Sequence, residues 1–297
     1  MNNWVLFVII GQFLYAIAVL IDRFIVTKKV VSKPIVYVFY VNFLSIFALG
    51  AIPFGVTLPE MWTILLSLCI AVSYAASIYF LYESLNNSNA SEVVPVIGGV
   101  SAISAFSLGT VLLGDGLPTR FIAGFIILVI GMLIISHFRF TARSFLFLTG
   151  SGFFFGLSTI LVKMLFVSTS FIDGFFWSRM ANVVVALALL TLPSVYKAIH
   201  HDHNYHKTPK TNKALFVMGN KALGALGFIF ILLAIERGNA AIINALSATQ
   251  YIFLLIFALF FGRLLPEYFE EKIHKHEFLH KSLATALIVL GFFVLFL

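Results

Sequence analysis

Charged side chains and cysteine are both scarce in this sequence. Only 10% of its 297 residues are charged, whereas 61% are apolar, and the mean hydropathy is +1.05. A soluble domain carries roughly 25% charged residues, so this chain cannot cover a folded surface with polar side chains. Its single cysteine, Cys69, lies within an apolar run and excludes an intrachain disulfide. The composition therefore excludes an ordinary water-soluble domain and indicates a protein of the lipid bilayer.

Central acids and nucleotide-binding motifs are also missing. Glu83, Asp173 and Glu236 all stand near the ends of apolar runs, and no acid lies in the middle of one. The sequence has no glycine-rich phosphate loop followed by Lys, no HExxH motif and no GxSxG motif. These absences argue against an ATP-driven pump and against a hydrolase, and no acid, base and nucleophile stand together as a membrane-embedded transferase would need. We therefore expect a protein that is not an enzyme and has no cofactor.

The apolar residues form long runs. Residues 4–21 and 35–53 contain no charge, and a helix of this length crosses the ~30 Å hydrocarbon core of a membrane. Helices satisfy their own backbone hydrogen bonds in lipid, and these runs lack the alternation of a β-barrel strand. The sequence predicts an all-α integral membrane protein with ten transmembrane helices. The predicted spans are 4–21, 35–53, 61–82, 93–113, 121–137, 145–163, 174–195, 214–235, 240–261 and 282–297.

The second half of the chain repeats the first. A shift of 140 residues places 11–53 on 151–193, so that Asn42 meets Asn182. A shift of 150 residues aligns the beginnings of the fourth and ninth spans. Because each half holds an odd number of spans, the second half begins on the opposite side of the membrane, an arrangement that recurs in secondary transporters. We expect two five-helix inverted-topology repeats, residues 1–140 and 141–297.

Basic residues concentrate on one face of the predicted membrane protein. The connections after the first, third, fifth, seventh and ninth spans hold 14 Lys and Arg residues, against three on the opposite face. The positive-inside rule places the base-rich connections in the cytoplasm and both termini outside. The net charge of +7 therefore reflects membrane topology. We expect a multi-pass protein of the plasma membrane without a nucleic-acid partner.

Small residues mark two helix contacts. Gly152 and Gly156 form a GxxxG pair in the sixth span, and Gly98, Ser101 and Ala105 form a stripe in the fourth. Small side chains let helix backbones approach closely in a membrane. We expect both groups to pack against neighbouring helices.

Two stretches carry motifs of a known transporter family. The first comprises 82–85, 89–91, 95–105, 112–115 and a glycine-bearing span at 121–137. The second comprises 233–240, 246–262 and a last span with Gly291. This order resembles the EamA-type halves of the drug/metabolite transporter superfamily, in which Arg179 matches an arginine near the start of a half's second helix. Asp115 replaces the usual Glu, and Arg263 stands at the equivalent place of the second half.

The resemblance implies a transporter whose termini lie in the cytoplasm, opposite to the orientation that the charge count predicts. The sequence predicts a secondary transporter that exports a small polar or amphipathic metabolite by alternating access. Its predicted partners are this small molecule and the lipid bilayer, with a homodimer as one assembly.

Polar side chains inside the spans are the candidates for substrate binding, because such groups usually face an aqueous cavity or a partner. Arg179 and Lys221 lie well inside spans and favour a substrate with a carboxylate or phosphate, unless both extend to the membrane interface. Asn42 and Asn182 occupy equivalent places in the two halves, where they contact substrate or hydrogen-bond neighbouring helices. The remaining candidates are Gln12, Tyr15, Asn244 and Gln250.

Histidine offers the main alternative. All eight histidines lie on the base-rich face. A non-transporting scaffold that binds a partner through these His-rich, base-rich loops is therefore the second interpretation. Clustered histidines also bind metals, but these have no fixed ligand spacing, and we predict no metal site.

Overall fold

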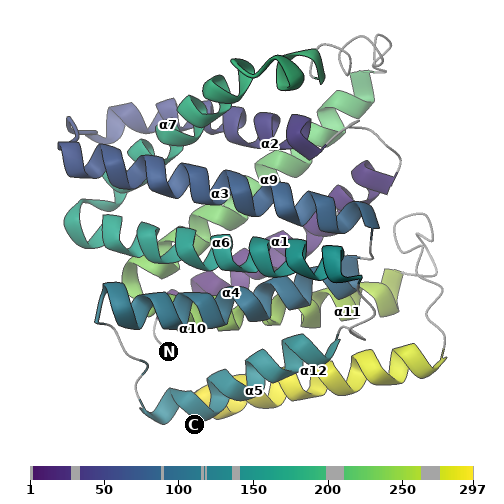
Figure 1. Cartoon of the computed structure of the whole chain (residues 1–297). Helices are drawn as coiled ribbons and strands as arrows, with labels where there is room; N and C mark the ends of the chain where they lie inside the picture. Colours follow the sequence, from purple (N-terminus) through teal and green to yellow (C-terminus); the bar gives the residue numbers. More distant parts are fainter. Residues whose placement is uncertain are drawn as a thin grey trace.

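The structure is a computed structural model of the chain, and it is helical. It describes residues 3–27, 34–87, 90–114, 117, 119–135, 141–198, 211–261 and 275–296. No strand occurs within these ranges. The helices form one bundle, with both ends of the chain towards the same end of it (Figure 1).

Each predicted span falls on one helix or on two consecutive helices. The first half contains α1 (Asn3–Thr27), α2 (Pro34–Phe43), η1 (Leu44–Phe54), α3 (Met61–Asn87), α4 (Ala90–Leu112) and α5 (Thr119–Ile135). The second half contains α6 (Ala142–Ser168), α7 (Phe171–Leu190), α9 (Thr211–Arg237), α10 (Ala240–Leu246), α11 (Thr249–Phe261) and α12 (Lys275–Phe296). A short helical stretch at 193–198 follows α7.

The lengths of these helices suit a membrane. Within the described residues, seven helical segments are long and apolar enough to cross a bilayer. Three shorter apolar segments, at 121–134, 240–254 and 282–294, fall on α5, on α10 with α11, and on α12. The prediction of an all-α, multi-pass membrane protein is confirmed at this level.

Two predicted spans are not uniform α-helices. The span at 35–53 begins as α2 and continues as η1, a 3₁₀ helix of 11 residues, although 3₁₀ runs longer than three or four residues are uncommon. It ends at Gly55, whose φ of 92° is left-handed and suits glycine. The span at 240–261 is interrupted at Ser247 and Ala248, whose N–H groups bond three residues back rather than four. The apolar composition of these spans does not predict such local changes of hydrogen bonding.

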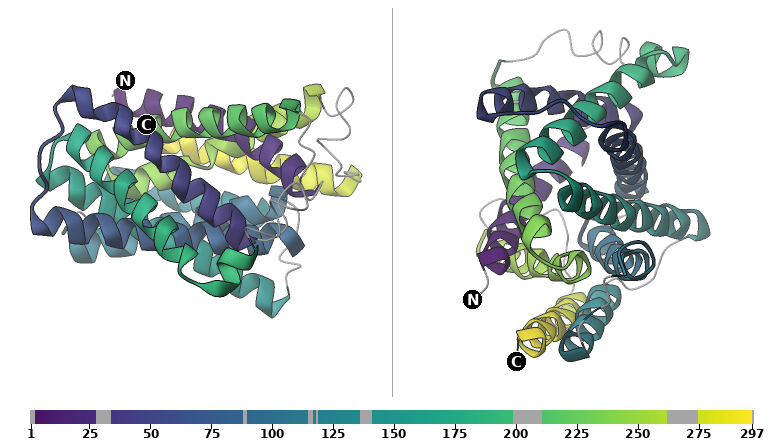
Figure 2. Two further views of the ribbon diagram at one scale, coloured as in Figure 1. Left: turned by 90° about the horizontal axis from the view of Figure 1, so that it is seen from above. Right: turned by 90° about the vertical axis from the view of Figure 1, so that its left-hand side faces the viewer.

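Close helix pairs build the bundle. α1 packs along α9, α3 and α4 both pack along α6, and α5 packs along α12. The α5–α12 pair lies side by side at one edge of the bundle in Figures 1 and 2. Gly11 and Gly227 meet where α1 crosses α9, since a Cβ added to either would lie 3.0–3.1 Å from the other's carbonyl oxygen. Because neither glycine has a side chain, the two helix backbones can make this close contact.

The predicted small-residue contacts join α6 to α4. A Cβ added to Gly152 would lie 2.6 Å from Val100 Cβ, and one added to Gly156 would lie 2.7 Å from the Ser101 carbonyl oxygen. Ser101 and Ala105 themselves are buried. Their expected role in packing is confirmed.

Candidate functional site

Arg179 lies deep in α7. The helix begins after Ser170, whose hydroxyl oxygen accepts from the Asp173 N–H at 3.1 Å, an ordinary N-cap. Arg179 follows eight residues after Phe171, about 12 Å along the axis at 1.5 Å per residue. Its side chain is only 8% exposed. An arginine that reached the interface would keep its guanidinium group in water, so this burial favours an interior position.

Aromatic rings from two other helices surround the guanidinium group. Its central carbon lies 4.5 Å from the centre of the Phe228 ring on α9 and 5.7 Å from that of Tyr74 on α3. Tyr15 of α1 lies within electrostatic range of both Arg179 and Tyr74. Residues from α1, α3, α7 and α9 therefore converge on one cation.

The ring contacts supply no hydrogen-bond acceptor for the N–H groups of the guanidinium group. Arginine carries five N–H donors in its plane. The Nε atom of Arg179 is enclosed and has no hydrogen-bond partner. Its electrostatic neighbours in the described chain are the phenols of Tyr15 and Tyr74, and no carboxylate is among them. The site thus holds a buried cation with unused donors.

The two equivalent asparagines, Asn42 and Asn182, are fully buried. Asn182, one turn beyond Arg179, donates from Nδ2 to Ser45 Oγ of η1 at 3.4 Å. Asn42 donates to the Val38 carbonyl oxygen of its own helix at 2.8 Å. The Oδ1 atoms of both asparagines have no hydrogen-bond partner. Asn182 thus connects α7 to η1.

Lys221 occupies a second aromatic environment. Its Nζ atom lies 4.3 Å from the centre of the Tyr37 ring on α2. Tyr37 in turn lies against Tyr82 of α3, with ring centres 3.9 Å apart. Lys221 and Phe228 are seven residues apart on α9 and therefore share one face. Both predicted basic candidates thus contact rings of neighbouring helices inside the bundle.

The remaining candidates divide into two groups. Gln12 is buried on α1, one turn before Tyr15, and its Oε1 has no partner. Asn244 of α10 accepts from Thr159 Oγ1 of α6 at 3.4 Å. Gln250 is buried on α11. No hydrogen bond or ring contact described for this part of the chain joins Asn244 or Gln250 to Arg179.

A contact at one end of the bundle was not expected from the sequence. The Thr57 N–H donates to Asp173 Oδ1 at 2.7 Å, and Trp177 Nε1 donates to the Thr57 carbonyl oxygen at 3.0 Å. We call these three residues the Thr57 clamp. It fastens the connection between η1 and α3 to the first turns of α7. The one sequence feature that points to this region is the spacing of Ser170 and Asp173, which is typical of a helix N-cap.

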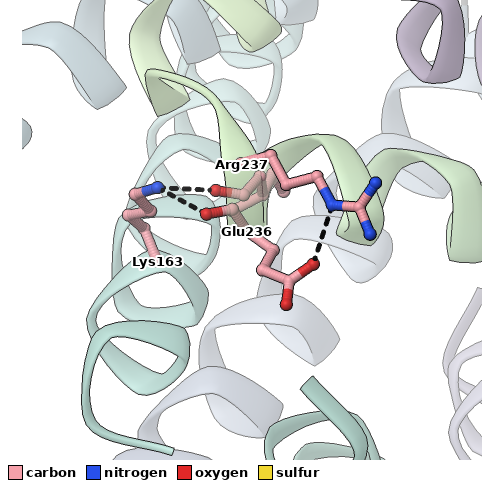
Figure 3. A network of polar contacts seen from close by, with 4 residues as sticks. Lys163, Glu236 and Arg237 are labelled. Carbon is pink, nitrogen blue, oxygen red and sulfur yellow. Dashed lines mark hydrogen bonds and ion pairs between the residues drawn. The ribbon is translucent and has the colours of Figure 1, made fainter. Parts of the chain in front are cut away.

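Lys163 was also missed. Near the end of α6, its Nζ atom donates to the carbonyl oxygens of Ile235 at 2.9 Å and Glu236 at 3.0 Å (Figure 3). Beside it, Arg237 Nε lies 3.4 Å from Glu236 Oε2. The last carbonyls of a helix lack backbone donors and carry partial negative charge. Lys163 therefore ties α6 to the end of α9.

Several expectations concern residues outside the described ranges. The connections at 199–210 and 262–274, with most of the histidines, lie there, and so do Asn89, Asp115 and Arg263 of the family motifs. Among the residues that the structure describes, no group of three His, Cys, Asp or Glu side chains could hold a metal ion.

Comparisons with known proteins concern the fold. No family model and no curated protein matches this sequence. Twenty-five chains of solved structures share the fold. One of them, a crystal structure of another protein, superposes on 99% of this chain and 98% of its own with a TM-score of 0.68 and 13% sequence identity. The whole helical arrangement therefore recurs in an experimentally determined protein, whereas so low an identity says nothing of function.

Proposed function

We propose that this chain is a secondary transporter of the EamA type, in the drug/metabolite transporter superfamily. It exports a small polar or amphipathic metabolite across the plasma membrane by alternating access, with the base-rich loops in the cytoplasm. The supporting observation is the set of buried polar atoms without partners inside the spans, at Arg179, Asn182, Asn42 and Gln12. Polar groups at membrane depth are costly and usually serve a transport pathway.

Reciprocal helix contacts support ten spans arranged as two inverted repeats. The shift of 140 residues takes Gly11 to Ser151, and the shift of 150 takes Ser77 to Gly227. Gly11 meets Gly227 between α1 and α9. Ser151 Oγ donates to the Ser77 carbonyl oxygen between α6 and α3 at 2.9 Å. The same pair of sequence positions therefore makes the contact in both places, as a pseudo-twofold axis requires.

The α5–α12 pair repeats this relation within itself. A shift of 160 residues takes Gly131 to Gly291 and Leu128 to Ile288. A Cβ on Gly131 would lie 2.8 Å from Ile288 Cγ1, and a Cβ on Gly291 would lie 2.9 Å from Leu128 Cγ. Exchange of the two halves therefore maps this interface onto itself.

One departure from this symmetry fits alternating access. α3 packs along α7 and the Thr57 clamp joins their ends, whereas the counterpart pair, α9 with α2, packs far less closely. In an inverted-repeat transporter, unequal packing of equivalent pairs distinguishes the end that is closed from the end that is open. The clamp would hold the terminal side of the bundle closed in this state.

The test is ligand binding followed by transport. The detergent-purified full chain is screened by thermal unfolding against amino acids, organic acids, sugar phosphates, nucleotide sugars and cationic drugs, since ligands of the folded state raise its apparent stability. A stabilising compound is then followed by counterflow in proteoliposomes. We expect the double variant Asn42→Ala/Asn182→Ala to lose counterflow, and Thr110→Ala, an exposed site on α4, to retain it. Absence of counterflow for every stabilising compound would overturn the transporter proposal.

A further inference from the structure

Among the side chains that the structure describes, no carboxylate accompanies the positive charge of Arg179 inside the bundle. The acids whose side chains the structure describes are Glu60, Glu83, Asp173 and Glu236, and each stands at or near the end of a helix. Asp173 is held by the Thr57 clamp, and Glu236 is paired with Arg237. Arg179 forms no ion pair with any of these described carboxylates. Its contacts are rings, and the phenols among them are neutral at physiological pH.

The guanidinium group of Arg179 has the donor chemistry of an oxyanion site. Phe228 and Tyr74 contact the guanidinium group through their rings, and its Nε atom has no hydrogen-bond partner. An arginine edge presents parallel N–H donors that match the two oxygens of a carboxylate or two oxygens of a phosphate. A buried cation of this kind is costly unless a counter-charge and hydrogen bonds complete it. Within the described chain, no residue completes it.

We propose that the transported molecule is an organic anion whose carboxylate or phosphate group pairs with Arg179. This inference rests on the proposed function and specifies its substrate class. The half-buried rings of Tyr74 and Phe228 provide contacts for an apolar or planar body next to that group. Asn182, one turn further into the membrane, supplies an unused Oδ1 acceptor for a hydroxyl or amino group of the same molecule.

The binding test varies the charge of a probe and keeps its shape. Benzoate, phenyl phosphate, neutral benzamide and cationic benzylammonium are each titrated against the full-length protein in detergent, with the thermal unfolding midpoint as the readout. We expect benzoate, phenyl phosphate or both to raise the midpoint in a saturable manner, and benzamide and benzylammonium to have no such effect. The stronger of the two anions identifies the oxyanion as carboxylate or phosphate.

Variants assign the effect to Arg179. Arg179→Gln should weaken anion binding about 10- to 150-fold, the range for lost hydrogen bonds to a charged group. Arg179→Lys keeps the charge but loses the planar pair of donors, so an intermediate affinity is expected. Arg143→Gln is the matched control, because Arg143 is an exposed arginine at the start of α6 that contacts Phe147. It should bind anions as the wild type does.

The outcomes separate this inference from the transporter proposal. Equal stabilisation by benzamide or benzylammonium, no response to either anion, or unchanged anion affinity in both Arg179 variants would overturn the anion site. The lysine variant decides the question if the glutamine variant does not fold. Anion binding that depends on Arg179 without counterflow would overturn the transporter and keep the site. Counterflow of a neutral compound that is independent of Arg179 would keep the transporter and overturn the anion.

Discussion

Gly156 provides a quantitative test of how α6 and α4 pack. An added Cβ would lie 2.6 Å from Ser104 Cβ, 2.7 Å from the Ser101 carbonyl oxygen and 2.9 Å from the Ala105 nitrogen. Ordinary contacts begin at 3.4 Å, and two of these three atoms belong to backbone that cannot rotate away. The helices would therefore have to separate for Gly156→Ala to fit.

Two opposing effects set the expected magnitude for Gly156→Ala. Alanine favours a helix over glycine by about 1 kcal/mol. Overpacking of a close contact costs about 1–3 kcal/mol, and rigid backbone partners place this site at the upper end of that range. The free energy of unfolding should thus fall by about 2 kcal/mol.

Gly219→Ala is the control for this prediction. Gly219 also lies within a helix, α9, but an added Cβ there has no atom within 4 Å. The same substitution should therefore stabilise the protein by up to about 1 kcal/mol. Both variants are compared with the wild type by thermal and by denaturant-induced unfolding in one detergent. If Gly156→Ala proved as stable as Gly219→Ala, α6 and α4 would not approach each other as described.

Three further predictions concern polar residues. Asp173→Ala removes a charged acceptor worth about 1.5–3 kcal/mol, so amide hydrogen exchange at Thr57 should become at least about tenfold faster; unchanged exchange would contradict the clamp. Lys163→Met leaves two carbonyls at the end of α9 without their donor and should lower thermal stability by about 1–3 kcal/mol. Ligand-free Arg179→Met should stay within about 1 kcal/mol of the wild type in stability, because an unpaired cation in a membrane costs about 2.5–3.5 kcal/mol and two ring contacts of about 1–2 kcal/mol each largely offset that cost; a larger loss of stability by thermal unfolding would indicate a structural arginine.

The spans could be predicted because lipid imposes a simple rule on composition. Every apolar run became a helix, but several helices extend further than their runs, as α3 does to Asn87 instead of residue 82. Polar residues at the membrane boundary continue a helix without adding to its hydropathy. The 3₁₀ geometry of η1 and the break at Ser247 depend on tertiary packing, and the apolar runs carry no signal for either.

The candidate site was predictable only in part. Arg179, Asn42 and Asn182 stood out because charged and amide side chains are rare inside apolar runs. Their aromatic neighbours did not, since 34 phenylalanines and 10 tyrosines give no reason to single out Phe228 or Tyr74. The pairing arises from the crossing of α3, α7 and α9, which a sequence does not specify residue by residue.

The 3₁₀ helix η1 also has a mechanical consequence. A 3₁₀ helix rises about 2.0 Å per residue and an α-helix 1.5 Å, so rewinding its 11 residues as α-helix would shorten the segment by about 5.5 Å and turn its far end by roughly 220°. Ser45, at the near end, bonds Asn182, while Thr57, just past the far end, bonds Asp173. Labels at positions 44 and 57 would record such a change as a shorter distance. Conversion of η1 to α-helix would therefore shorten the segment enough to break the hydrogen bond between Thr57 and Asp173. The hydrogen bond between Ser45 and Asn182, at the other end of η1, would remain.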